Sequence, residues 1–163
     1  MKHAICLTAL AGLLALTPGA HAGELGDALE ETGWDLLLGT WVDESTGGAA
    51  VTWEIVWTHP ETVITWTSTE GDRINTSLVA HSKNQDTFFA VSADNQGGSA
   101  LGEWRFSDDE ATAEALYVTG NGEAGAIRLI LTREQEDADT ITVRVDGTTV
   151  VYRMIRAKDP AAG

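Results

Sequence analysis

The chain has 163 residues, a length that suits one domain with one hydrophobic core. Hydrophobic residues make up 43% of it and charged residues 21%, which excludes a disordered or collagen-like chain. With 10 Lys and Arg against 25 Asp and Glu, the formal net charge is -15, so a nucleic-acid backbone would be repelled and we expect no nucleic-acid partner.

Residues 1–22 have the three parts of a secretory signal peptide. Lys2 provides a positive start, residues 4–16 form an apolar run, and Ala20-His21-Ala22 is a small-x-small cleavage site. The apolar run is shorter than the roughly 20 residues that span a bilayer, so we expect cleavage after Ala22 and no membrane span afterwards. Cys6 would leave with this segment. The sequence therefore predicts an exported protein, periplasmic or secreted, that folds without disulfides.

The next segment, residues 23–33, is expected to form a short amphipathic helix, because its apolar residues recur at i, i+3 and i+4. After Trp34 the period changes from helical spacing to two. Between Val51 and Thr58 apolar and polar residues alternate, which predicts a strand with one strongly apolar face. Pro60 then marks a turn.

The same alternation predicts about ten short strands in total. Beyond 51–58 and a strand that contains Ile64 and Trp66, they are expected at 39–44, 73–81, 86–92, 101–107, 113–119, 125–133, 139–146 and 149–156. The connections are too short for crossover helices, so neighbouring strands should pair antiparallel as a meander. Such a sheet stacks as a sandwich or closes into a barrel, and closure removes the exposed edges. Residues 159–163 are expected to be a frayed tail.

The segment from Trp34 to Trp41, with the sequence Trp-Asp-Leu-Leu-Leu-Gly-Thr-Trp, resembles the Gly-x-Trp opening of lipocalin-like (calycin-type) barrels, in which a short helix leads into the first strand. The resemblance continues through the aromatic-rich hairpin at 51–66. It also includes residues 102–107, which resemble the central Trp-x-Phe strand of the bacterial DUF1579-type group. It implies an all-β fold over residues 34–158: a single antiparallel β-barrel of about eight to ten strands with one closed end and an open mouth.

The same resemblance implies a structural plug at the closed end. In that class an Arg or Lys of the last strand lies over the indole of the Gly-x-Trp motif. We match Arg153 to this position, with Arg156 next, and therefore expect a plug made of Gly39, Trp41 and Arg153. A guanidinium over an indole is worth roughly 0.5–2 kcal/mol, so a structural role is favoured over a catalytic one.

Six tryptophans are many for a chain of this size. If their strand face lines the barrel, Trp53, Trp57, Trp66 and Trp104 would form an aromatic wall for an apolar or planar ligand. The same large side chains would also fill a narrow barrel. The sequence leaves both interpretations open.

Other candidate chemistry has little support in the spacing of residues. His59 and His81 are not spaced as metal ligands, so we expect them to be solvated and expect no metal site. A Gly-x-Ser-x-Gly nucleophile motif is absent. The alternation places Glu54, Glu103 and Arg105 on the outside, away from any cavity. We expect no cofactor, and the sequence specifies no catalytic residue.

These observations favour an exported lipocalin-like barrel that binds a small hydrophobic or amphipathic molecule in an aromatic-lined interior. One alternative is a filled barrel that serves as a protein-interaction module of the cell envelope, and its mark would be a contiguous exposed apolar patch. A second alternative is a small cofactor-free barrel enzyme, which needs a perturbed titratable group inside the cavity. The sequence identifies neither the ligand nor a protein partner.

Overall fold

The computed structural model describes residues 25–134, 137–146 and 151–157. The predicted signal peptide at 1–22, the tail at 159–163 and the start of the strand predicted at 149–156 lie outside these residues. The elements in chain order are α1 (Leu25–Thr32), the 3-10 helix η1 (Trp34–Leu37), β1 (Gly39–Asp43), β2 (Val51–His59), β3 (Val63–Glu70), β4 (Arg73–Ser82), β5 (Thr87–Asp94), β6 (Ser99–Phe106), β7 (Glu110–Val118), β8 (Ala124–Glu134), β9 (Asp137–Val145) and β10 (Val151–Arg156).

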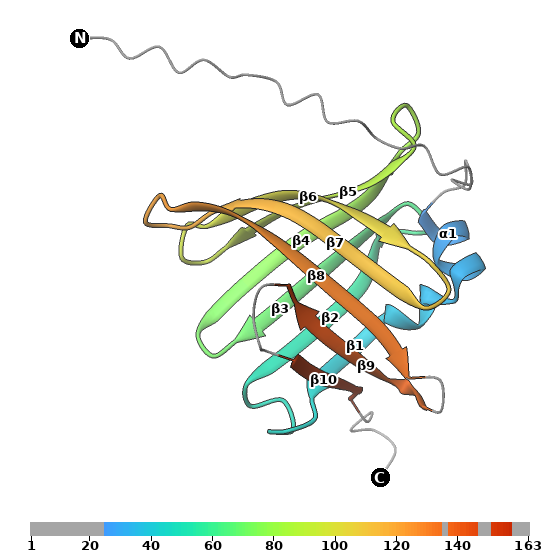
Figure 1. The fold of residues 1–163 in the computed structure, drawn as a ribbon, viewed down its shortest axis with the longest axis horizontal. Coiled ribbons are helices and arrows are strands. Elements are labelled where there is room, and N and C mark those ends of the chain that lie inside the picture. Colours follow the sequence, from blue (N-terminus) through green and yellow to red (C-terminus); the bar gives the residue numbers. More distant parts are fainter. Residues whose placement is uncertain (1–24, 135–136, 147–150, 158–163) are drawn as a thin grey trace.

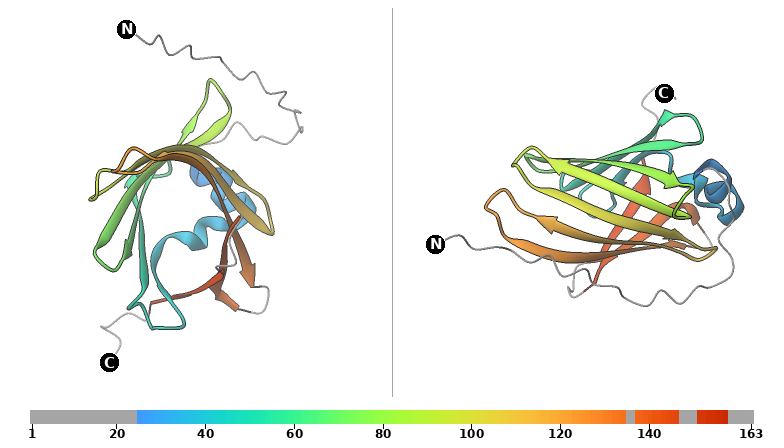
Figure 2. Two further views of the ribbon diagram at one scale, coloured as in Figure 1. Left: turned by 60° about the vertical axis from the view of Figure 1, so that its left-hand side comes forward. Right: turned by 90° about the horizontal axis from the view of Figure 1, so that it is seen from above.

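The ten strands form one closed antiparallel barrel in meander order, in which β1 lies between β2 and β10 (Figure 1). The all-β barrel predicted from the sequence is confirmed, at the upper end of the expected strand number. The predicted short helix is α1, whose apolar side Leu25, Ala28 and Leu29 is buried. Figure 2 shows α1 at one end of the barrel.

The core is densest at the end of the barrel that α1 and η1 cover, which we call the closed end. Trp34, Trp41, Ile141 and Met154 have no exposed surface there. The Gly26 N–H donates to the carbonyl of Glu61, in the β2–β3 turn, at 2.8 Å, so the helix is tied to the barrel by backbone as well as by packing. Within the described residues, no helix is long and apolar enough to cross a membrane.

The plug at the closed end is built by Arg156, and the prediction of Arg153 is wrong. The Arg156 guanidinium lies 4.5 Å from the centroid of the Trp41 ring and donates to the carbonyls of Leu36 (2.5 Å) and Leu38 (2.9 Å). Trp41 and Arg156 are opposite each other in the β1–β10 register. Since side chains alternate along a strand, Arg153 must face outward when Arg156 faces inward.

Arg153 instead forms ion pairs on the outer surface. Its guanidinium contacts Glu134 at 2.7 Å and Glu44 at 2.5 Å. Gly39 has the expected structural role, because its φ of 122° suits glycine and a Cβ there would lie 2.7 Å from Arg156 Nη1. Because Gly39 has no side chain, the Arg156 guanidinium has room to lie over Trp41.

Candidate functional site

The middle of the barrel interior contains a chain of ring contacts, which we call the aromatic cluster. The cluster comprises Trp53, Trp66, Trp104, Phe106, Phe88 and His81, contributed by β2, β3, β6, β5 and β4. Centroid separations between successive rings run from 4.8 to 5.7 Å. Such distances place each ring in direct contact with the next.

The structure brings together three of the four tryptophans predicted to bind a ligand. Trp66 lies between Trp53, at 4.8 Å, and Trp104, at 5.3 Å, and all three are 6–8% exposed. Trp57 lies on the same face of β2, nearer the closed end, and is half-buried. Trp53, Trp66 and Trp104 all belong to the buried hydrophobic core of the barrel. Their role in binding stays a prediction.

The interior on the open-end side of the cluster is lined by small and polar side chains. We call this part the mouth cup; it is formed by Ser68, Asn75, Ser77, Ser92, Ala100 and Tyr117, all half-buried. The pairing of the strands places these residues next to one another, since Ser68 is opposite Asn75 and Ser77 is opposite Ser92. Trp53 and Trp66 are opposite Ser68 and Ser77 respectively, so the mouth cup adjoins the aromatic cluster on the inner face of the sheet.

Unequal strand lengths explain why the mouth cup is open on one side. The pairing of β8 with β9 begins only at Leu129, while β8 itself starts at Ala124. Figure 1 shows β5 to β8 continuing beyond the shorter strands β9, β10 and β1. Ile127 lies in this extended part of β8, on the same face as the buried Leu131, and is nevertheless 40% exposed. An inward-facing isoleucine is therefore in contact with water.

Near the open end, two carboxylates accept hydrogen bonds from residues of the adjoining turns. Hydrogen bonds hold the pKa of the buried Asp43 well below its usual range. The largest contribution comes from the Thr46 hydroxyl, and the backbone N–H groups of Val51 and Thr46 contribute less. The Gly98 N–H, at 2.7 Å, and the Arg73 guanidinium likewise lower the pKa of Asp94. Both groups are ionised acceptors that stabilise loops.

The two histidines have different surroundings. His59 is exposed at the end of β2, as predicted. The expectation that His81 is solvated is wrong, because β4 continues to Ser82 and the alternation turns His81 inward with its side chain 4% exposed. Among the residues that the structure describes, neither of its ring nitrogens has a hydrogen-bond partner, although Asp86 Oδ1 lies 3.4 Å from Nε2.

The remaining candidate groups lie outside the barrel. Glu54, Glu103 and Arg105 are exposed, which confirms the placement predicted from the alternation. Within the described ranges, no group of three or more His, Cys, Asp or Glu side chains could hold a metal ion.

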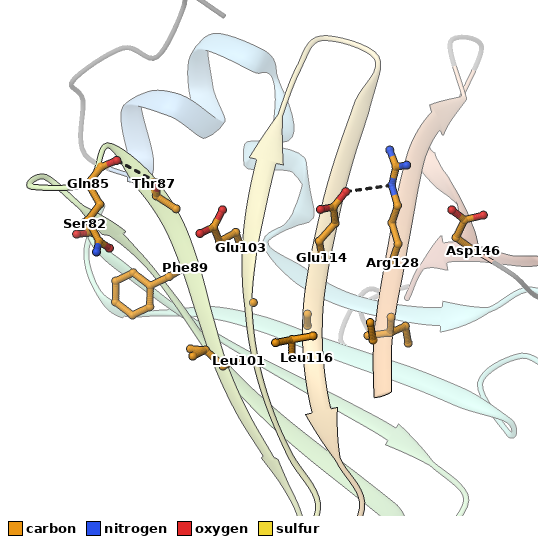
Figure 3. A pocket seen from close by; sticks show the side chains of 14 residues that line it. Ser82, Gln85, Thr87, Phe89, Leu101, Glu103, Glu114, Leu116, Arg128 and Asp146 are labelled. Atoms are coloured by element: carbon orange, nitrogen blue, oxygen red, sulfur yellow. Dashed lines mark hydrogen bonds and ion pairs between the residues drawn. The ribbon is translucent and has the colours of Figure 1, made fainter. Parts of the chain in front are cut away.

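A concave surface on the outside of β5 to β8 was not predicted from the sequence. A hollow of about 1030 Å³ lies there, and its lining includes Phe89, Leu101, Glu103, Glu114, Leu116 and Arg128 (Figure 3). The signal was present in the sequence. Leu101 has the same strand parity as the outward Glu103 and Arg105, so the alternation already places a large apolar side chain in water.

Comparisons with models of protein families, with curated proteins and with solved structures find no match for this chain. The features left to indicate a function are the half-buried polar side chains of the mouth cup, inside the barrel, and the hollow on the outside of β5 to β8.

Proposed function

We propose that the barrel binds a small hydrophobic or amphipathic molecule through its open end. The apolar part of the ligand would lie against Trp53, Trp66 and Ile127. Its polar part would meet the hydroxyl and amide groups of the mouth cup, which can both donate and accept hydrogen bonds.

The observation that carries this proposal is the exposure of Ile127. Inward-facing side chains at the closed end, such as Trp41 and Ile141, have no exposed surface, whereas Ile127 faces the same interior and is 40% exposed. A ligand that covers apolar surface gains roughly 25 cal/mol per Å² removed from water. The mouth cup thus combines uncovered apolar surface with polar groups around it, as small-molecule sites do.

A matched pair of substitutions tests this proposal. Ser92 faces into the cup and its neighbour Ala93 faces outward, so Ser92→Phe fills the cup while Ala93→Phe adds the same ring outside. The probe is N-phenyl-1-naphthylamine, a neutral amphipathic dye whose emission rises in apolar surroundings. We expect the wild type and Ala93→Phe to bind it and Ser92→Phe to bind at least about tenfold more weakly.

Two further results complete the test. Leu116→Ser, on the outer face, should leave dye binding unchanged; a loss there would place the dye in the outer groove and contradict the proposal. Native mass spectrometry of protein from its producing cells should show a bound small molecule that denaturation releases. Absence of such a molecule, together with no dye binding, would refute the proposal.

We propose further that the chain is exported and that its barrel belongs to the lipocalin-like class. The three-part pattern of residues 1–22 supports export. The Gly39 and Trp41 motif, covered by the Arg156 guanidinium, supports the class. Sequencing the amino terminus of protein recovered from the periplasm or the medium should find Gly23 first; an intact amino terminus in the cytoplasm would contradict export.

A further inference from the structure

An apolar row crosses the outer surface of the barrel at right angles to the strands. We call it the outer row; it consists of Leu78, Val91, Leu101, Leu116 and Ala126, which are successive partners in the registers of β4 to β8. Leu101 is 62% exposed and Leu116 is 71% exposed. At about 4.8 Å between strands, the row is about 19 Å long. Aligned large apolar side chains on a water-facing surface mark an interaction site.

A charged row lies beside the outer row, one step further along the strands. Phe89, Glu103, Glu114 and Arg128 are successive partners on β5 to β8. Figure 3 shows Glu103 and Glu114 on one level of the groove and Leu101 and Leu116 on the next. The groove therefore has an apolar floor with an acidic edge.

The protein itself neutralises the acidic edge only in part. Glu103 and Glu114 are directly opposite each other, and like charges in that position destabilise a sheet. Arg128 lies 3.6 Å from Glu114. Among the described residues, the Glu103 carboxylate has no ion-pair or hydrogen-bond partner. A cation placed between the two carboxylates would relieve their repulsion.

The shape and charge of the groove select among possible occupants. An added strand would find no free backbone, because β5, β6 and β7 are paired on both sides. A second copy of this chain, or an anionic membrane surface, would bring more negative charge to a protein whose formal net charge is already -15. An α-helix satisfies its own backbone and covers about 19 Å with roughly 13 residues.

We propose that the outer groove of β5 to β8 docks a basic amphipathic helix of a partner protein. The apolar face of the helix lies along the outer row, and its Lys or Arg side chains pair with Glu103 and Glu114. The side chains of the outer row lie on the opposite face of the sheet from those of the mouth cup, and Ile127 also lines the outer hollow. The substitutions that test this proposal are therefore placed at Leu101, Leu116, Glu103 and Glu114, whose side chains do not face the mouth cup.

The test uses a synthetic helical peptide of about 14 residues with Leu at i, i+3, i+4 and i+7 and Lys on the flanks of that face. A peptide of the same composition with its Leu residues spread around the helix is the control. Binding of each labelled peptide to the full protein is followed by fluorescence anisotropy at about 0.15 M salt. We expect the amphipathic peptide to bind at least about tenfold more tightly than the control peptide.

Paired variants locate the binding. Glu103→Gln with Glu114→Gln, and separately Leu101→Ser with Leu116→Ser, should each weaken binding about tenfold or more. The matched control is Glu54→Gln with Val56→Ser, on the exposed face of β2, which should change affinity less than about twofold. All of these positions are exposed, so the fold should tolerate the changes.

Several outcomes would overturn the proposal. Equal binding by all variants, or equal binding of the two peptides, would mean general attraction of cations to an acidic protein. Absence of peptide binding, accompanied by dimerisation that Leu101→Ser with Leu116→Ser abolishes, would assign the groove to a second copy. Binding to neutral phosphatidylcholine vesicles through the same leucines, without peptide binding, would assign it to lipid.

Discussion

Replacing Trp66 by alanine is the most direct test of how the barrel interior is stabilised. Trp66 is 8% exposed and contacts both Trp53 and Trp104, so its removal breaks the centre of the aromatic cluster. Deleting a buried aromatic side chain costs about 3–5 kcal/mol, and each ring contact adds about 0.5–1.5 kcal/mol beyond buried area. The measured cost of such a deletion already includes the lost ring contacts, and two of them place Trp66 in the upper part of its range, so we expect Trp66→Ala to lower the free energy of unfolding by about 4–5 kcal/mol.

The assay is urea unfolding followed by far-UV circular dichroism, because tryptophan fluorescence changes with the substitution itself. Trp57→Ala is the matched control, since Trp57 has the same side chain on the same interior face but is only half-buried. It should cost about 2 kcal/mol. The reasoning is refuted if Trp66→Ala costs no more than Trp57→Ala at an unchanged m-value, because the cluster would then not hold the core together.

Three further predictions concern charged and polar groups. Arg156→Lys should destabilise the protein by about 2 kcal/mol in urea unfolding, because lysine cannot both cover Trp41 and donate hydrogen bonds to two carbonyls. The control Arg153→Lys should cost less. Equal losses for the two variants would contradict the role of Arg156 as the plug. Because the pKa of Asp43 is lower in the folded than in the unfolded state, its stabilising contribution is full above about pH 4 and is lost as the pH falls below that value. The urea midpoint of the wild type should therefore fall more steeply between about pH 4 and about pH 2.5 than that of Asp43→Asn, and equal slopes would count against the reasoning. Finally, His81→Phe removes two buried nitrogens that lack hydrogen-bond partners and should raise the free energy of unfolding by about 1 kcal/mol; a comparable loss would show that the imidazole has a partner in solution.

The alternation of apolar and polar residues was sufficient to predict the strands and to predict which side chains face the barrel interior and which face outward. Period-two alternation predicted the strands and put Glu54, Glu103 and Arg105 outside, where the structure has them. The same alternation shows that only one of Arg153 and Arg156 can face the barrel interior. Arg153 and Arg156 have opposite parity, and only register, which a single sequence does not reveal, shows that Arg156 is the one opposite Trp41.

The mouth cup and the outer row were harder to predict because they depend on how strands of different length are placed side by side. The mouth cup exists because β8 extends beyond its pairing with β9, a property of neighbouring strands and not of either strand alone. The outer row needs five strands in one register before its leucines line up. His81 was misplaced for a local reason, since the strand was expected to end at that residue and instead runs to Ser82.

The seam between β1 and β10 has a consequence for how the chain folds. Arg156 bonds the carbonyl of Leu38 across 118 positions of sequence, so the contact that closes the ring joins nearly the two ends of the described chain. Closing so large a loop costs entropy before any contact is gained, and topologies of this kind fold slowly. Until β10 arrives, β1 and β9 each have a free edge that can pair with another molecule. Chains cut short before Val151 should therefore aggregate, and the last strand decides whether the protein stays in solution during synthesis and refolding.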